Sequence, residues 1–192
     1  MKKRMITTAI AFALVLTNAT AETDPIETKK VNTEKSNITW VGKKVLGSHT
    51  GTIALKSGEL VMDGTQLTGG NFVVDMSTLT VTDLEPGKGK EKLEGHLNSD
   101  EFFGTENFPQ ATFTITSAIK KGSAYAVTGD LTIKGVTHPA TFDLAVSDNS
   151  ATTTFKIDRT KFGIRYGSAS FVDNLKDNAI NDEFELTVNL VF

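Results

Sequence analysis

The sequence predicts an all-β domain of about eight mainly antiparallel strands with a short helical insertion. Three observations lead to this prediction. Apolar and polar residues alternate with a period of two over most of the chain from Asn37 onward, as in strands with one buried face. Pairs containing Gly, Asp or Asn separate the alternating runs. Residues 87–103 show a helical spacing instead. A sheet of this size closes into a barrel or folds into a sandwich.

The last segment shows the alternation most clearly. From Ile180 to Phe192 the even-numbered residues are apolar except for Asp182, and the odd-numbered residues are polar except for Val191. One dry face and one wet face favour an antiparallel sheet.

A second clear pattern is a hairpin, in which Lys134-Gly135 joins two alternating runs, 127–133 and 136–146. Further strands are expected at residues 37–44, 47–55, 58–62, 66–76, 110–119 and 151–158. Turns are expected at residues 63–64, 69–70, 121–122 and 148–149.

The helical insertion is indicated by Leu93, His96 and Leu97, which recur at spacings of three and four. Ser99-Asp100 then resembles the N-cap of a further helical turn.

The chain begins with signals for export. Met1 to Arg4 is basic, residues 5–16 are mainly apolar, and Ala19-Thr20-Ala21 has the small-residue pattern of a cleavage site. The alternative, a membrane anchor, is disfavoured because spanning a bilayer takes roughly 20 apolar residues. We therefore expect a signal peptide at residues 1–21, a flexible polar leader at 22–35, and one domain at 36–192.

Composition excludes several classes of function. Loss of Lys2, Lys3 and Arg4 takes the formal charge from −3 to about −6, and without a basic block the protein is not expected to bind nucleic acid. Because there are no cysteines, disulfides and thiol chemistry are excluded. His49, His96 and His138 lack ligand-like spacing, so no metal site is expected. Motifs of hydrolases, zinc proteases and nucleotide-binding proteins are absent.

Two features of the interior leave alternatives open. Many of the 12 phenylalanines are in the inward phase, so they either fill a core or form the wall of an apolar cavity. Arg159 and Arg165 either bind an anionic head group, or close the barrel end through strand carbonyls or a neighbouring carboxylate. The phenylalanines in the inward phase are Phe72, Phe113, Phe142, Phe155, Phe184 and Phe192.

Three ordered motifs resemble those of the YceI-like family. Residues 129–137 (GDLTIKGVT) resemble its G-x-L-T-I-x-G-V-T hairpin. Residues 96–103 (HLNSDEFF), followed by residues 108–113 (FPQATF), resemble its H-L-x-S-x-x-F-F…P-x-x-x-F block. Residues 159–163 (RTKFG) match its R-x-x-F-G motif. The resemblance extends over nearly all of the chain after the expected cleavage point.

The resemblance implies an extended, eight-stranded, lipocalin-like β-barrel with one or two short helices packed beside it. It further implies a periplasmic protein that binds a polyisoprenoid, such as an isoprenoid quinone, or another long-chain amphiphile. No catalytic residues can be transferred, and no cofactor other than such a lipid is expected. The expected head-group contacts are Arg159 and Arg165. The expected cavity lining is Ile38, Trp40, His49, Ile53, Phe72, Val74, Phe113, Leu131, Phe142, Leu144, Phe155, Phe184 and Leu186.

The expected function is therefore non-catalytic lipid transport or storage by a monomer or homodimer that transiently contacts a membrane surface. Two alternatives stay open. One is an enzyme that acts on a barrel-bound lipid with His49 or His96 as acid or base. The other is an envelope stress protein with a solid core that acts through its surface.

Overall fold

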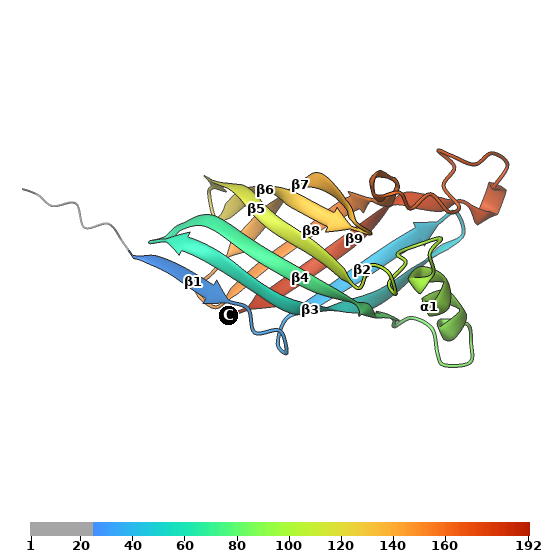
Figure 1. Ribbon diagram of the computed structural model, residues 1–192, viewed down its shortest axis with the longest axis horizontal. Coiled ribbons are helices and arrows are strands. Elements are labelled where there is room, and N and C mark those ends of the chain that lie inside the picture. Colours follow the sequence, from blue (N-terminus) through green and yellow to red (C-terminus); the bar gives the residue numbers. More distant parts are fainter. Residues whose placement is uncertain (1–24) are drawn as a thin grey trace, which may run out of the picture.

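The computed structural model describes residues 25–192, and its strands β2 to β9 form a closed antiparallel barrel (Figure 1). The expected signal peptide lies outside the described residues. The strands are β1 (Ile26–Lys30), β2 (Asn37–Lys44), β3 (Gly47–Asp63), β4 (Gln66–Val81), β5 (Gln110–Lys121), β6 (Ala124–Ile133), β7 (Val136–Val146), β8 (Ser150–Asp158) and β9 (Ile180–Val191). The helices are α1 (Lys90–Asn98) and two 3-10 turns, η1 (Arg159–Phe162) and η2 (Lys176–Asn178).

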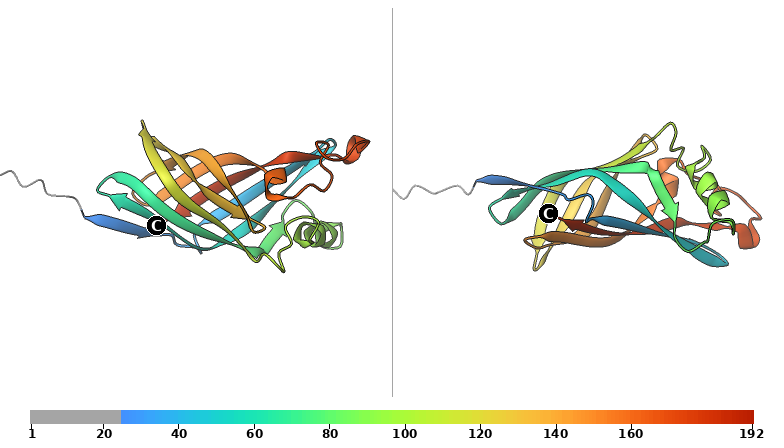
Figure 2. Two further views of the ribbon diagram at one scale, coloured as in Figure 1. Left: turned by 45° about the horizontal axis from the view of Figure 1, so that its top comes forward. Right: turned by 90° about the horizontal axis from the view of Figure 1, so that it is seen from below.

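Consecutive strands from β2 to β9 are hydrogen-bonded neighbours, and β9 pairs with β2 to complete the circle. The predicted all-β, eight-stranded, lipocalin-like barrel is confirmed. Two ends can be distinguished (Figures 1 and 2). We call the end where α1 and residues 163–179 lie the helix end, and the opposite end, where β1 lies, the closed end.

Strand β1 differs from the flexible leader that the sequence predicted for residues 22–35. It pairs antiparallel with the end of β3, from Ile26↔Asp63 to Lys30↔Glu59. The amide of Val31 then donates to the carbonyl of Gly58 at 2.9 Å. β2 pairs with β3 only as far as Ile53, so the rest of that edge is available and β1 satisfies its backbone groups.

Two sequence predictions, one for β3 and one for β4, differ from the structure. The turn predicted at Gly69-Gly70 is wrong, because both residues lie within β4. A Cβ on Gly70 would lie 2.7 Å from the carbonyl oxygen of Glu59, so the glycine permits close approach to β3. Residues 47–55 and 58–62, predicted as two strands, form the single strand β3, with an irregular register between Leu55 and Ser57.

Helix α1 is present as predicted, but the role predicted for Ser99 is wrong. Ser99 is the C-cap of α1, and its amide and hydroxyl both donate to the carbonyl of His96, at 3.2 and 2.7 Å. Residues 100–103 form turns and no further helix. On the inner side of α1, Glu94 accepts hydrogen bonds from the Thr80 hydroxyl and the Val81 amide of β4. These bonds attach the helix to the barrel.

The barrel has one weak seam, between β7 and β8, where register pairs join only Ala145 to Thr152 and Val146 to Ala151. Beyond them the strands diverge, and side chains bridge the gap. The Phe142 and Phe155 rings stack there with centroids 4.2 Å apart.

Candidate functional site

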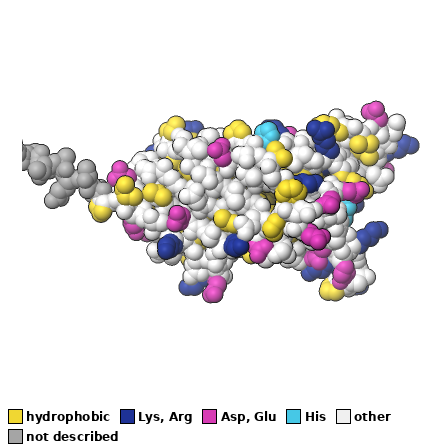
Figure 3. Space-filling view, viewed as in Figure 1, with side chains coloured by type: hydrophobic (Ala, Val, Ile, Leu, Met, Phe, Trp, Pro, Cys, Tyr) yellow, Lys and Arg dark blue, Asp and Glu magenta, His cyan; other side chains and the backbone are white. Residues whose placement is uncertain are grey.

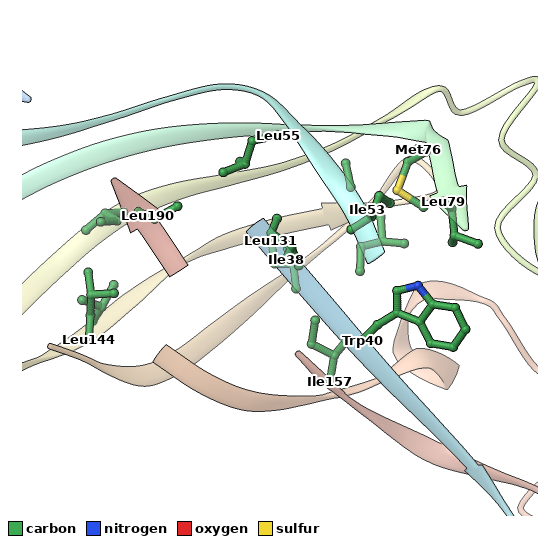
Figure 4. Packing of buried hydrophobic residues seen from close by; sticks show 14 of the residues in the cluster. Ile38, Trp40, Ile53, Leu55, Met76, Leu79, Leu131, Leu144, Ile157 and Leu190 are labelled. Carbon is green, nitrogen blue, oxygen red and sulfur yellow. The ribbon is translucent and has the colours of Figure 1, made fainter. Parts of the chain in front are cut away.

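A cavity of about 250 Å³ opens at the helix end of the barrel. Its walls are mainly apolar, and Figure 4 shows several of the side chains involved, among them Trp40 of β2 and Leu79 of β4. An apolar pocket with few polar groups is typical of sites for hydrophobic ligands.

A layer of phenylalanine rings lies beneath this cavity. Along β5, Ala111 lines the cavity, Phe113 follows inward, and Ile115 is buried toward the closed end. Successive rings contact one another from β4 through β5 and β7 to β8, with centroid distances of 6.5, 5.2 and 4.2 Å. In order, the layer consists of Phe72, Phe113, Phe142 and Phe155.

Beyond the phenylalanine layer the interior is filled with side chains. Leu60 and Val127 have no exposed surface, and Leu144 and Leu190 have almost none. The hydroxyl of Tyr125 donates to the carbonyl of Thr65 at 2.7 Å, which satisfies the polar atom of this buried ring. The sequence left open whether the inward phenylalanines fill a core or form the wall of a cavity. The barrel contains both, a filled core at one end and a cavity at the other.

The structure separates the residues that the sequence predicted as cavity lining into two groups. Those that line the cavity are Ile38, Trp40, His49, Ile53, Val74, Leu131, Phe184 and Leu186. Those that lie deeper are the four rings of the phenylalanine layer and Leu144 at the closed end. Alternation identifies the inward face of a strand, but it carries no information on height along the barrel axis.

Sequence reasoning missed the part of the lining that comes from outside the sheet. Leu93, His96 and Leu97 of α1 and the following Phe102 and Phe103 cover the helix end of the cavity. The spacing of three and four in α1 was the available signal, since it marks an apolar helix face that needs a partner surface.

The guanidinium of Arg159 is fully used by backbone carbonyls at the helix end of the barrel. Its side chain is buried, and it donates to the carbonyls of Asn181, Ile164, Tyr166 and Ile180 at 2.8–3.0 Å. Burial lowers its pKa, while the carboxylates of Asp182 and Asp158 oppose that shift. Of the two roles considered for this arginine, its contacts correspond to barrel closure.

Asp182, the polar exception in the inward phase of β9, is explained by this arginine. One of its oxygens lies 3.6 Å from the Arg159 guanidinium, and the other accepts from the Ser170 hydroxyl at 2.6 Å. Hydrogen bonding by Ser168 and Ser170, with a contribution from Arg159, lowers the pKa of Asp182 against the opposing effect of burial. Arg165, by contrast, is exposed, and its guanidinium lies over the Phe171 ring at 4.5 Å.

The three histidines occupy different places. His49 lies at the cavity mouth, where its Nδ1 is 2.9 Å from Asp83. Burial raises the pKa of Asp83, but hydrogen bonds from His49 and the Thr50 amide outweigh it and give a lowered pKa. His96 lines the cavity from α1, and His138 packs against the Phe162 ring. Within residues 25–192 no group of three or more His, Asp or Glu side chains is arranged to hold a metal ion.

The three motifs singled out in the sequence converge on this end of the barrel. The hairpin motif contributes Leu131 and Ile133 to the cavity, the helical block contributes His96 and Phe102, and the third motif contributes Arg159. The YceI-like domain model matches residues 30–192, which is most of the chain. This chain belongs to the YceI-like family.

Relatives by sequence match shorter segments. Protein YceI of Escherichia coli O157:H7 is 38% identical over 73 residues, which cover 38% of each chain. A UPF0312 protein of Staphylococcus aureus (strain USA300) is 35% identical over 110 residues, covering 52% of this chain and 62% of that protein. The matched part thus spans less than two thirds of the length of these curated relatives.

Solved structures of YceI-like fold superimpose on more of the chain. BcnA of Burkholderia cenocepacia is 23% identical with a TM-score of 0.67, covering 84% of this chain and 99% of that one. A polyisoprenoid binding domain of Saccharophagus degradans is 16% identical with a TM-score of 0.60, covering 86% and 97%. At these identities the likeness establishes the fold.

No helix among residues 25–192 of this YceI-like protein is long and apolar enough to cross a membrane.

Proposed function

We propose that this YceI-like protein is a non-catalytic periplasmic carrier or store that holds a polyisoprenoid or another long-chain amphiphile in its barrel. The observation that carries the proposal is the apolar cavity at the helix end, with the phenylalanine layer deeper in the same barrel. The name of the Saccharophagus domain supports the ligand class. The export signal in the sequence supports the location.

The physical requirement for such a carrier is a dry surface. Burial of a methylene group is worth about 0.8 kcal/mol, so a long tail leaves a membrane only for a comparable apolar environment. Side chains such as Leu97, Phe184 and Leu186 offer that environment, and the opening at the helix end allows a chain to enter.

Native mass spectrometry after gentle purification tests the proposal. We expect a lipid adduct, or uptake of an added prenyl alcohol by delipidated protein. Ala111→Phe places a ring in the cavity and should reduce uptake strongly. Ala145→Phe makes the same change on the outside of β7 and should not. A protein that carries no lipid and takes up no long-chain amphiphile would refute the proposal.

We further propose that the helix end contacts a membrane surface during loading. Exposed apolar side chains from residues 43–46 and 161–179 gather there in what we call the rim patch. The Val45 amide donates to the Ala179 carbonyl and thereby joins these two segments. Residues 43–46 and 161–179 contain five basic and two acidic residues, a local charge of +3 in a chain of net charge −3. Figure 3 shows hydrophobic and basic side chains close together at this end. The rim patch consists of Val45, Leu46, Tyr166, Phe171 and Val172.

Vesicle flotation tests this contact. Phe171→Ser should weaken binding to vesicles that contain phosphatidylglycerol, whereas Ile119→Ser, at an apolar site on β5 that is also more than half exposed, should not. Equal binding by both variants and the unaltered protein would exclude the rim patch as the contact.

A further inference from the structure

Strand β1 leaves one backbone edge of the sheet without a neighbour. It stands at the end of the strand order, and among residues 25–192 it pairs only with β3. Figures 1 and 2 show it at the outer margin of the closed end. Its side chains are exposed apart from a half-buried Lys29, and Ile26 has 74% of its surface in solvent. A free strand edge with an exposed apolar side chain is a template for pairing with another chain.

The register with β3 determines which backbone groups lie on this free edge. The Val31 amide donates to the carbonyl of Gly58 of β3 at 2.9 Å, and it continues the register of the preceding pairs. Residues of an antiparallel ladder alternate between those that bond the neighbouring strand and those that turn away from it. Glu27 and Lys29 are in phase with Val31, so their backbone groups face β3. The residues whose N–H and C=O groups point along the free edge are Ile26, Thr28 and Lys30.

The backbone of this edge is complementary to itself. When two copies pair antiparallel about a two-fold axis at Thr28, this residue lies opposite Thr28 of the partner subunit. Ile26 then lies opposite Lys30 of the partner subunit. The backbone groups at these positions point outward, so each pair can exchange both N–H···O bonds. The methylene stem of the lysine covers the exposed isoleucine side chain.

The charges of β1 also fit this register. Glu27 lies opposite Lys29 of the partner subunit, at a position without backbone hydrogen bonds, where facing side chains are closest. Both side chains border a hollow at the rim of the closed end, so they lie on one face of the strand. The Lys29 ammonium donates to the carbonyl of Asp148 at 3.1 Å, and its other N–H groups remain for a carboxylate.

Other two-fold registers are disfavoured by the same charges. An axis at Glu27 places two carboxylates opposite each other, and an axis at Lys29 does the same with two ammonium groups. Like charges directly opposite destabilise a strand pair. An axis at either end of β1 pairs only part of the strand. The register centred on Thr28 is therefore the one that the side chains favour.

We propose that two copies of this protein associate through β1, in the antiparallel arrangement centred on Thr28. The inference goes beyond the proposed lipid binding and does not depend on it. Because the two-fold axis reverses the strand direction, the two helix ends point away from each other and both cavity openings stay free. The contact is small, so we expect a concentration-dependent equilibrium and not a permanent dimer.

Sedimentation velocity over a range of concentrations tests the association. We expect the exported chain to form dimers as its concentration rises. Glu27→Lys places lysines opposite each other and should raise the dissociation constant by at least about tenfold. Glu34→Lys makes the same change of charge at an exposed position outside β1 and should leave the constant unchanged.

A mixture of two variants tests the register itself. At the facing positions Glu27→Lys presents two lysines and Lys29→Glu presents two glutamates. Each should associate poorly with itself, whereas together they should form a heterodimer. Thr28→Pro removes an outward N–H without breaking the ladder to β3, and it should also dissociate the dimer. Thermal unfolding of each variant checks that the barrel is intact.

The outcomes separate this inference from lipid binding. A protein that stays monomeric up to about 1 mM would refute the association. A dimer that Glu27→Lys does not weaken, or a mixture without heterodimer, would assign the contact to another surface and also overturn the inference. Uptake of a prenyl alcohol should be the same in all of these variants, so their failure to associate leaves the proposed function untouched.

Discussion

The two ends of the barrel are built from the same alternating strands but have different interiors. At the closed end, Leu60, Val127 and Leu190 fill the lumen and almost no polar group is enclosed. At the helix end, the inward positions of the same strands surround a cavity that side chains of α1 also line. The hollow at the rim of the closed end has polar as well as apolar walls and lies between residues such as Glu27, Lys120 and Asp148, whereas the helix end retains an apolar cavity inside the barrel.

The difference arises from what covers each end. Short turns join the strands at the closed end, so facing side chains meet directly. At the helix end, α1 and residues 159–179 are inserted between strands, and side chains of α1 line the cavity. Arg159 supports that arrangement by binding carbonyls of Ile164, Tyr166 and Ile180. The comparison teaches that strands with one alternating pattern can be packed at one end of a barrel and border a cavity at the end that carries insertions.

The largest effect is expected for Arg159→Met. The change leaves four buried or partly buried carbonyls without their donor, and we expect a loss of about 3–5 kcal/mol in the free energy of unfolding. Arg159→Lys keeps the charge but cannot reach four acceptors, so it should recover only a minor part. Urea unfolding measures both. A loss below about 1 kcal/mol for the Met variant would contradict the closure role.

The comparison of the two ends is tested by one substitution at two depths. Leu60→Ala at the closed end should lower the free energy of unfolding by about 2–5 kcal/mol, because it opens a void in a filled interior. Leu79→Ala at the cavity should lower it by at least about 1 kcal/mol less, since its side chain already borders open space. Equal losses in thermal or urea unfolding would show that the ends are packed alike.

The phenylalanine layer should act as the floor of the cavity. Phe142→Ala extends the space inward, and binding should shift toward longer prenyl alcohols, with about a tenfold gain for each pair of additional buried carbons. Leu144→Ala, one layer deeper, is the control and should leave the chain-length preference unchanged. Competition between prenyl alcohols of different length measures the shift; an unchanged preference in Phe142→Ala would rule out a floor at this position.

The smallest expected effect concerns the attachment of α1. The hydrogen bond from Thr80, with that from the Val81 amide, lowers the pKa of Glu94 below its usual value of 4.5, while burial opposes the shift. A lowered pKa in the folded state means that stability is complete above about pH 4.5 and falls as the carboxylate is protonated at lower pH.

Glu94→Gln should remove that part of the acid dependence and weaken the attachment by about 1 kcal/mol near neutral pH. Glu101→Gln changes an exposed carboxylate just after the helix and serves as the control. Hydrogen exchange of α1 amides, measured at neutral and acidic pH, distinguishes the variants. An acid dependence that persists unchanged in Glu94→Gln would assign it to other groups.

Local patterns were sufficient for most strand positions. The bounds predicted for β2 and β7, residues 37–44 and 136–146, agree with the structure. The Lys134-Gly135 turn also formed as predicted, and both residues have positive φ, 50° and 73°. The period of two and the turn residues are properties of neighbouring residues, so a single sequence reveals them. Strand β1 was missed because its residues gain structure only from the free edge of β3.

The sequence by itself determined that the chain forms an antiparallel β domain with inward-facing Phe, Leu and Ile side chains, and its motifs indicated the family. Only the tertiary structure decided which inward residues enclose space. Phe184 borders the cavity, whereas Phe142 lies in the layer below, although both occupy inward positions on their strands. The physical reason is that strand tilt, register and the placement of α1 set the height of each side chain, and these depend on contacts between residues far apart in the chain.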